Sequence, residues 1–264
     1  MRVILLGPQR RPTLDGVARS LGLLGRDGPV ATVTAGWQER EPDDGLLGTL
    51  LGGADVNLGL YRRWLDVQDR DPDYAAGARR LSEVVGELED TYLLRLDYAL
   101  QAVYALQNRS SGGDQDDAIA DAIAAVRELD EAHLHQVGSV RGEFFAELRP
   151  HDRPVIAEHR AAVAGVLGEA SALVMAGGHV GVLAEVLHLF NIAAALRSPL
   201  SPVIAWSAGA MALADRIVLF HDRSPQGPGH PEVYGAGLSL LREVVLLPHE
   251  IGRASCRERV YHPV

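Results

Sequence analysis

The sequence contains no lysine, a single cysteine and few aromatic residues, which make up 5% of the chain. The one thiol, Cys256, cannot form an internal disulfide, and this predicts a protein of a reducing compartment, which we take to be the cytoplasm. The 25 basic residues are all arginine and are outnumbered by 35 acidic residues, so the formal net charge is −10. Because binding along a nucleic-acid backbone requires a basic surface, we expect no nucleic-acid partner.

Long apolar runs are also missing from the sequence. No run approaches the roughly 18 residues that a membrane-spanning helix needs, so we expect no membrane partner. The N-terminal residues MRVILLGPQRRP include too short an apolar stretch for a signal peptide and predict a first buried strand instead. Hydrophobic residues nevertheless occupy 47% of the 264 positions, which excludes a chain that is disordered throughout.

Short apolar runs rich in valine, isoleucine and leucine recur along the chain. Their length and composition predict strands that are buried on both faces of a parallel sheet. The runs are Val3–Leu6, Val30–Thr34, Val56–Leu60, Ala172–Ala176, Val203–Trp206, Ile217–Phe220 and Val244–Leu247. Helical segments such as Val180–Leu196 lie between several of them, and this alternation predicts an α/β layered fold. Prolines and glycines near Asp222–Tyr234 predict an extra hairpin or loop there.

The middle of the chain departs from this alternation. Apolar residues follow helical spacing over Tyr74–Gln107 and again over Asp116–Leu148, and the polar segment Asn108–Gln115 separates the two stretches. We predict an antiparallel helical hairpin whose helices are roughly 45–50 Å long. We interpret it as an insertion, at about residues 62–150, into a single α/β domain that spans residues 1–250. It would serve as a lid over the site or as a homodimer contact. A third helix, Pro154–Leu167, is predicted to return the chain to the sheet.

One segment, VIAWSAGAMALADRIVLFHD at positions 203–222, carries the clearest chemical signal. A buried strand is predicted to end at Trp206, and Ser207 follows it, with the small residues Ala208, Gly209 and Ala210 next. A nucleophile on a sharp strand-to-helix turn needs such small neighbours, because the backbone there is tight. The alternative is a serine that caps an ordinary crossover helix.

A second strand runs into two glycines, Gly177 and Gly178, within ALVMAGGHVG. Glycine lets the backbone approach a ligand closely and aim an N–H at it, so this turn could supply part of an oxyanion hole. Ordinary turn chemistry is the alternative. Three of the histidines that follow Ser207 in the chain are candidate bases, namely His221, His230 and His249. His249 follows the apolar run VVLLP, at a position where open α/β sheets place their sites.

The segment AWSAGA, Ala205–Ala210, resembles the nucleophile turn of peptidase family S51, which includes aspartyl dipeptidases and cyanophycinases. The resemblance covers the first strands and residues 172–249. It implies a three-layer α/β fold with a mostly parallel sheet, like that of class I glutamine amidotransferases and flavodoxins, with the helical hairpin inserted. It also implies a serine hydrolase that cleaves a small peptide or amide bond, without a cofactor or a metal. The glycine turn differs from the family pattern, because Ala176 stands for a glycine and His179 for an asparagine.

The same resemblance implies a role for each site residue. Ser207 would attack the carbonyl carbon, His249 would accept its proton, and Asp222 would orient the imidazole. The backbone N–H groups of Ala208 and Gly178, with Gly177 beside them, would bind the oxyanion.

Several assignments stay open in the sequence. Glu250 and Asp215 are rivals of Asp222, and His179 and Arg223 are candidates for binding the substrate. The main functional alternative is a non-catalytic member of the same fold that binds a small molecule or regulates a partner. Release of ammonia, as in amidotransferases, is a weaker alternative, because serine replaces the thiol.

Other motifs do not predict a site. His133 and His135 lie two residues apart on a predicted helix, so we expect them to face different directions and, with Glu131, to belong to a solvated face. The acidic stretch Asp114–Asp121 lacks the pattern of a calcium loop. Residues 251–264 show no periodicity and resemble a translated sequencing adapter. We therefore expect a non-native tail that replaces a missing C-terminus.

Overall fold

The computed structural model describes residues 2–7, 9, 13–23, 28–109, 115–196, 202–219 and 231–247. These residues form two compact units. The first unit comprises the described residues up to Ala75, those from Arg149 to Ile217 and those from Gly237 onward. The second unit comprises the described residues of 76–148 and 218–236. The division into a single domain with an insertion at residues 62–150 stays a prediction.

The first unit is built on a parallel five-stranded sheet of order β1-β5-β4-β2-β3. The strands are β1 (Val3–Leu6), β2 (Val30–Val33), β3 (Asp55–Asn57), β4 (Ala172–Met175) and β5 (Val203–Trp206). Every residue of β2, β4 and β5 is buried, as expected for strands covered on both faces. The prediction of an α/β fold with a parallel sheet is therefore confirmed.

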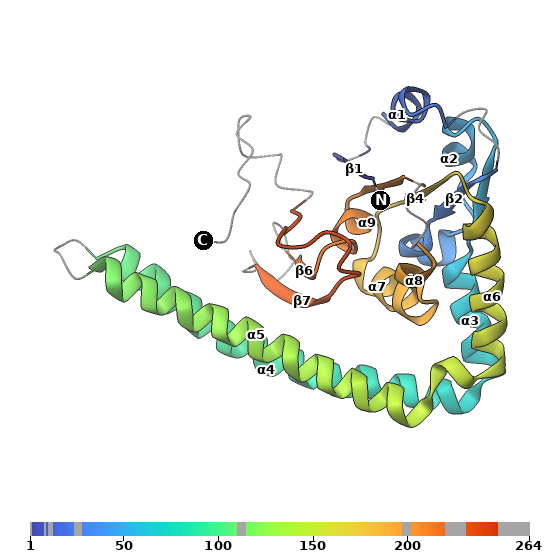
Figure 1. Cartoon of the computed structure of the whole chain (residues 1–264). Coiled ribbons are helices and arrows are strands. Elements are labelled where there is room, and N and C mark those ends of the chain that lie inside the picture. The colour runs from blue at the N-terminus through green and yellow to red at the C-terminus, as the bar shows by residue number, and fades with distance from the viewer. Residues whose placement is uncertain are drawn as a thin grey trace. The chain divides into compact units, whose positions relative to one another are not determined.

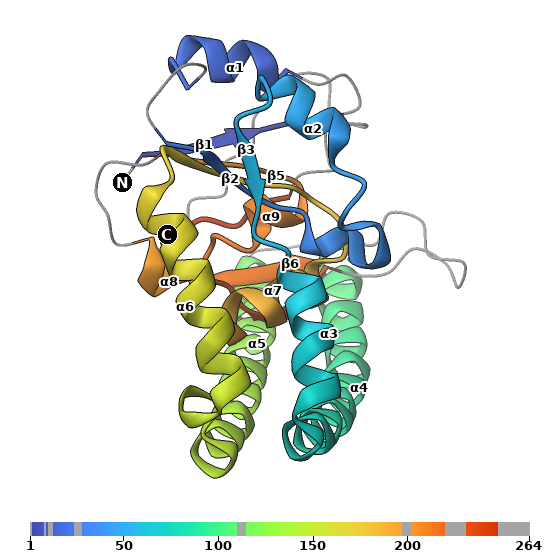
Figure 2. The same ribbon diagram turned by 90° about the vertical axis from the view of Figure 1, so that its right-hand side faces the viewer.

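Helices cover both faces of this sheet (Figure 2). The helices of the first unit are α1 (Leu14–Ser20), η1 (Ala35–Arg40), α2 (Gly45–Leu50), α3 (Leu60–Arg70), η2 (Pro150–Asp152), α6 (Pro154–Glu169), α7 (Val180–Leu189), α8 (Ile192–Ala195) and α9 (Ala208–Met211). Figure 2 shows α1 and α2 on one side of the sheet and α6, α7 and α8 on the other. On the first side, alternate strand residues such as Val30, Val174 and Ile204 pack against Leu14 and Leu47.

The order of the strands creates a switch point between β2 and β4. These two strands are neighbours, but the chain leaves β2 toward β3 at one edge and leaves β4 toward β5 on the other side. In open α/β sheets, ligands bind outside the carboxyl ends of the strands at such a point. We therefore expect a binding site among the connections that follow β2, β4 and β5.

The second unit contains two long helices and a two-stranded sheet (Figure 1). Its elements are most of α4 (Pro72–Gln107), α5 (Gln115–Leu148), the end of β6 (Arg216–Leu219) and β7 (Glu232–Ala236). Both predicted helices of the hairpin are confirmed to within two residues at their described ends. Tyr92 from α4 donates a hydrogen bond to Asp130 of α5 at 2.8 Å and accepts one from the N–H of Val233 at 3.0 Å.

Two of the predicted strands of the parallel sheet are wrong. Ile217–Phe220 corresponds to β6, which pairs with β7 in a separate sheet. Val244–Leu247 forms no strand, and Val244 and Val245 are 38% and 43% exposed. An apolar run indicates that a strand is favoured but not which neighbour it finds. The segment before Val244 is held by hydrogen bonds to residues 212–215, which follow α9, and not by the edge of the parallel sheet.

The largest differences in bounds concern two other predicted elements. The strand expected at Val56–Leu60 ends at Asn57, because Gly59 adopts a left-handed conformation with φ 59° and α3 begins at Leu60. The helix expected at Val180–Leu196 is broken between α7 and α8, where Asn191 has φ 54°. Among the residues that the structure describes, no helix is long and apolar enough to cross a membrane.

Candidate functional site at the carboxyl edge of the parallel sheet

Ser207 lies on a strained turn between β5 and α9. Its backbone has φ 50° and ψ −129°, a combination that residues other than glycine rarely adopt and that costs about 1–3 kcal/mol. Its carbonyl oxygen accepts a hydrogen bond from the N–H of Met211 at 3.0 Å, so the helix starts at once. The hydroxyl does not cap α9, which disfavours the alternative of an ordinary N-cap serine. The side chain is half-buried.

Two glycines make room for this turn. A Cβ atom on Gly177 would lie 2.7 Å from the Cβ and 3.0 Å from the Oγ of Ser207, so the backbone after β4 runs directly against the serine side chain. A Cβ atom on Gly209 would lie 2.5 Å from the carbonyl oxygen of Met175 and 2.6 Å from that of Ala176. The first turn of α9 therefore packs on the end of β4, and neither position has space for a side chain.

The glycine turn after β4 also contacts the connection that follows β2. Gly178 has φ +124°, and a Cβ atom there would lie 2.3 Å from the carbonyl oxygen of Gly36. That oxygen accepts a hydrogen bond from the N–H of His179 at 2.7 Å. Gly36 is thus part of the same edge, at the switch point between β2 and β4. Sequence reasoning missed it, although a glycine directly after a predicted strand, in VTAGW, is a usable signal.

His179 is the N-cap residue of α7, and its side chain is exposed. Its Nδ1 atom accepts a hydrogen bond from the N–H of Val182 at 3.2 Å. A neutral imidazole that accepts at Nδ1 carries its proton on Nε2, so the ring presents an N–H donor near the glycine turn. The prediction that His179 contacts substrate remains open, and this donor is the group that would make the contact.

A second strained residue, Gln38, follows β2. Its φ of 57° and ψ of −124° nearly match those of Ser207, and its side chain is half-buried. Strain of this kind persists only where the surroundings over-determine the conformation, and it clusters at functional sites. Glutamine has no sequence pattern that marks such a conformation, so the sequence could not have revealed it.

The segment that contains Gly36 and Gln38 is fastened to α3. The buried carboxylate of Glu41 accepts hydrogen bonds from the N–H groups of Tyr61 and Arg62, both at 2.9 Å. The hydroxyl of Tyr61 donates to Glu39 at 2.9 Å. Burial, reinforced by the hydrogen bond to Glu39, raises the pKa of Tyr61 above its usual value. A backbone hydrogen bond and the Tyr61 hydroxyl lower the pKa of Glu39.

The chain that leads toward His249 returns to the residues just after the serine turn. The N–H of Leu238 donates to the carbonyl oxygen of Ala212 at 2.8 Å, and that of Leu240 donates to the carbonyl of Leu213 at 2.9 Å. The carboxylate of Asp215 accepts a hydrogen bond from the N–H of Glu243 at 2.9 Å, so it helps to hold this segment.

Six of the candidate site residues lie outside the described residues. They are His221, Asp222, Arg223, His230, His249 and Glu250. The expected tail at residues 251–264, with Cys256, also lies outside them. The structure therefore brings together Ser207, Ala208, Gly177, Gly178 and His179 and leaves the triad as a prediction.

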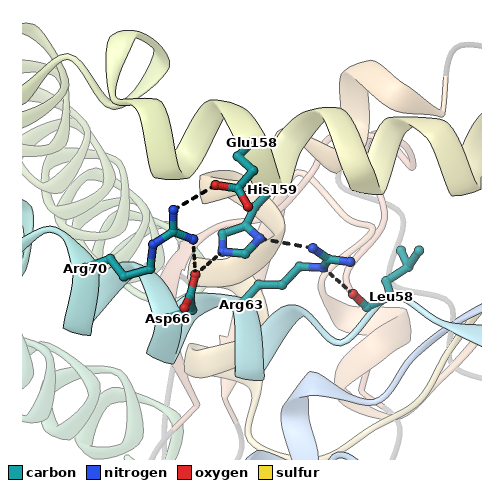
Figure 3. Close-up of polar contacts among 6 residues, drawn as sticks. All are labelled: Leu58, Arg63, Asp66, Arg70, Glu158 and His159. Carbon is teal, nitrogen blue, oxygen red and sulfur yellow. Dashed lines mark hydrogen bonds and ion pairs between the residues drawn. The ribbon is translucent and has the colours of Figure 1, made fainter.

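A described histidine outside this edge, His159, already has partners on both ring nitrogens (Figure 3). Its Nε2 lies 2.7 Å from the carboxylate of Asp66, and its Nδ1 lies 3.0 Å from Nη1 of Arg63. Because arginine can only donate, Nδ1 is the acceptor and Nε2–H donates to Asp66. The pair resembles half of a catalytic triad, but neither nitrogen is available to accept a proton from a serine. Its role is to join α3 to α6.

Among the residues that the structure describes, no group of three or more histidine, cysteine or acidic side chains is placed to hold a metal ion. The expectation for His133 and His135 is partly wrong. His135 is exposed, but His133 is 2% exposed and stacks on Tyr92, with ring centroids 4.1 Å apart. The pattern of α5 places His133 on the face that meets α4.

No protein-family model matches this chain, and the comparison with curated proteins found no match.

Proposed function

We propose that this protein is a serine hydrolase that cleaves a small peptide or amide bond and resembles family S51 peptidases, with a fold like that of class I glutamine amidotransferases. The observation that carries the proposal is the conformation of Ser207. A serine with φ 50° at the carboxyl end of a buried parallel strand is held in a strained geometry, and its side chain does not cap the helix. Such strain has a use where a nucleophile must stand clear of its backbone.

In the proposed reaction, Oγ of Ser207 attacks the carbonyl carbon of the substrate while His249 accepts the hydroxyl proton. The tetrahedral intermediate then collapses, the bond to the amine breaks, and the imidazolium gives its proton to the leaving nitrogen. A water molecule, deprotonated by the same imidazole, hydrolyses the acyl-enzyme and regenerates the serine. Asp222 would keep the imidazole in the required tautomer.

The turn after β4 supports an oxyanion hole beside the serine. Gly177 lies against the Ser207 side chain, and the N–H groups of Ala208 and Gly178 are the proposed donors to the oxyanion. Removing one donor of this kind typically costs about 3–4 kcal/mol of barrier. A second candidate function, non-catalytic binding of a small molecule, is favoured by the two departures from the family motif, Ala176 and His179.

Labelling with a fluorophosphonate tests the proposal, because only an activated serine reacts. We expect the wild-type protein to be labelled at Ser207 and the Ser207→Ala variant to be unlabelled and inactive. Ser82→Ala, at an exposed position of α4, is the control and should label as the wild type does. The labelling rate should fall below about pH 6.5, where free histidine gains a proton. Absence of labelling in a folded wild-type protein would refute the hydrolase and leave the binding function.

A further inference from the structure

A cavity of about 160 Å³ lies on the face of the sheet that α1 and α2 cover. It is lined by Gln9, Leu14, Trp37, Leu46, Leu47, Leu50 and Trp206. Gln9 follows β1, Trp37 belongs to the connection after β2, and Trp206 is the last residue of β5. The cavity therefore lies at the carboxyl edge of the sheet, where the candidate site also lies.

The cavity is adjacent in the chain to both strained residues. Trp206 directly precedes Ser207, and Trp37 stands between Gly36 and Gln38. The indole of Trp206 packs in the core on the α1 and α2 side, together with Ile204 of the same strand. One wall of the cavity and the serine turn are therefore consecutive parts of the same backbone segment at the carboxyl end of β5.

The lining is almost entirely apolar. It consists of two indoles, four leucine side chains and one amide, and the described residues that line it include no charged group. A cavity of about 150 Å³ lined by apolar side chains is large enough for benzene. An aspartate side chain would lose its hydration here without gaining a cationic partner among these described lining residues, which is costly. An aromatic or branched apolar group fits both the volume and the chemistry.

The wall formed by α2 is open to solvent. Leu46 is 67% exposed, although it lines the cavity, and Trp37 and Leu50 are only partly buried. A large apolar side chain exposed at the rim of an apolar cavity is typical of a ligand-binding surface. The cavity is accordingly reachable from outside.

We infer that this cavity receives an aromatic or branched apolar side chain of the substrate, next to the scissile bond. The inference rests on the proposed function and deepens it, because it assigns a substrate class. It also departs from the aspartyl preference that the family resemblance would suggest, since the described residues that line the cavity offer no counter-charge to a carboxylate.

Binding is tested first, without reference to catalysis. Toluene is the probe, and its binding is followed by tryptophan fluorescence in a Trp64→Phe variant, whose remaining tryptophans both line the cavity. Saturation-transfer NMR on the wild-type protein gives a second readout that needs no substitution. We expect saturable binding that Ser207→Ala preserves.

The matched variants are Leu46→Asp and Leu65→Asp. Leu46 lies on the rim, whereas Leu65 is 45% exposed on α3 and does not line the cavity. We expect Leu46→Asp to weaken toluene binding about tenfold or more, because it places a carboxylate at the rim, and Leu65→Asp to leave binding unchanged. Equal effects of the two variants would overturn the assignment of the cavity.

Substrate preference is tested with dipeptides that differ only in one side chain, carrying phenylalanine, leucine, alanine or aspartate. We expect kcat/KM for phenylalanine and leucine to exceed that for alanine by about tenfold or more, and Leu46→Asp to abolish this preference. A preference for aspartate would overturn the inference.

The outcomes separate the two proposals. Fluorophosphonate labelling without toluene binding would refute the cavity assignment and leave the hydrolase. Toluene binding without labelling would refute the hydrolase, and with it the assignment of the cavity to a scissile substrate.

Discussion

The two units of the molecule achieve order in different ways. In the first, β2, β4 and β5 are buried along their whole length, and the loops at their ends are fixed by hydrogen bonds and by close backbone contacts between glycines. In the second, two regular helices meet along few buried side chains, such as Tyr92, Leu96 and Leu129. A densely contacted region can hold strained residues, whereas a helical pair keeps every residue in a relaxed conformation. This contrast explains why Ser207 and Gln38 both lie in the first unit.

The largest effect should come from adding one methyl group at the strained edge. In Gly209→Ala, the new Cβ atom would approach two backbone carbonyl oxygens to about 2.5–2.6 Å, and backbone cannot move aside cheaply. We expect the free energy of unfolding to fall by about 3 kcal/mol and the melting temperature to fall by roughly 6–12 °C. Labelling of Ser207 should disappear as well.

A glycine-to-alanine substitution in the second unit supplies the control. Gly138 lies at an exposed position of α5 with nothing within 4 Å of an added Cβ atom. Gly138→Ala should therefore stabilise the protein by about 0.5–1 kcal/mol, because alanine loses less conformational freedom in a helix. Similar losses for both variants would remove the contrast between the two units.

A smaller effect is expected from Tyr92→Phe in the second unit. The variant removes the hydroxyl that joins the Asp130 carboxylate to the buried N–H of Val233. We expect the free energy of unfolding to fall by about 2 kcal/mol. Tyr98→Phe, on the same helix but 67% exposed, is the matched control and should have almost no effect. Hydrogen exchange measures the result, since it reports each unit separately. We expect faster exchange in α4, α5 and β7 and no change in the parallel sheet.

Faster exchange in the sheet, at the level seen in α4, would show that the Tyr92 hydroxyl stabilises both units. The two units would then unfold together, and the distinction between them would be one of geometry alone.

The smallest effect concerns acid and His133. Burial lowers the pKa of His133 below its usual value of 6.5, so the unfolded chain binds the proton more readily than the folded one. Neutral His133 therefore contributes to the stability of the second unit. This contribution is fully present above about pH 6.5 and is lost as the pH falls below that value. The loss should be smaller than that in Tyr92→Phe.

The check is the difference in melting temperature between wild type and His133→Phe, measured at pH 7 and at pH 5. This difference cancels contributions from other groups, such as Glu89, whose pKa is raised chiefly by burial. His133→Phe should lose less stability in acid than the wild type, whereas His135→Phe, at an exposed position, should lose as much as the wild type. Identical acid profiles for wild type and His133→Phe would show that His133 carries no such dependence.

The sequence predicted the positions of the strands and helices better than it predicted which strands pair with one another. The run at Val203–Trp206 and most of the run at Ala172–Ala176 are strands, because short apolar segments favour burial in a parallel sheet. The run at Val244–Leu247 has the same composition but forms no strand, because the chain before it is held by hydrogen bonds to residues 212–215. Composition is local, whereas the choice of a partner strand depends on the whole chain.

For the candidate site, the sequence by itself determined where a nucleophile could stand, because Ser207 follows a buried strand and precedes three small residues. It also determined that Gly177 and Gly178 would follow another strand. Only the tertiary structure decided that Gly36 joins them, that Gln38 shares the strained backbone of Ser207, and that two tryptophans far apart in the chain line one cavity. The physical reason is that spacing along the chain sets local conformation, whereas contacts between the ends of different strands exist only once the sheet has fixed their order.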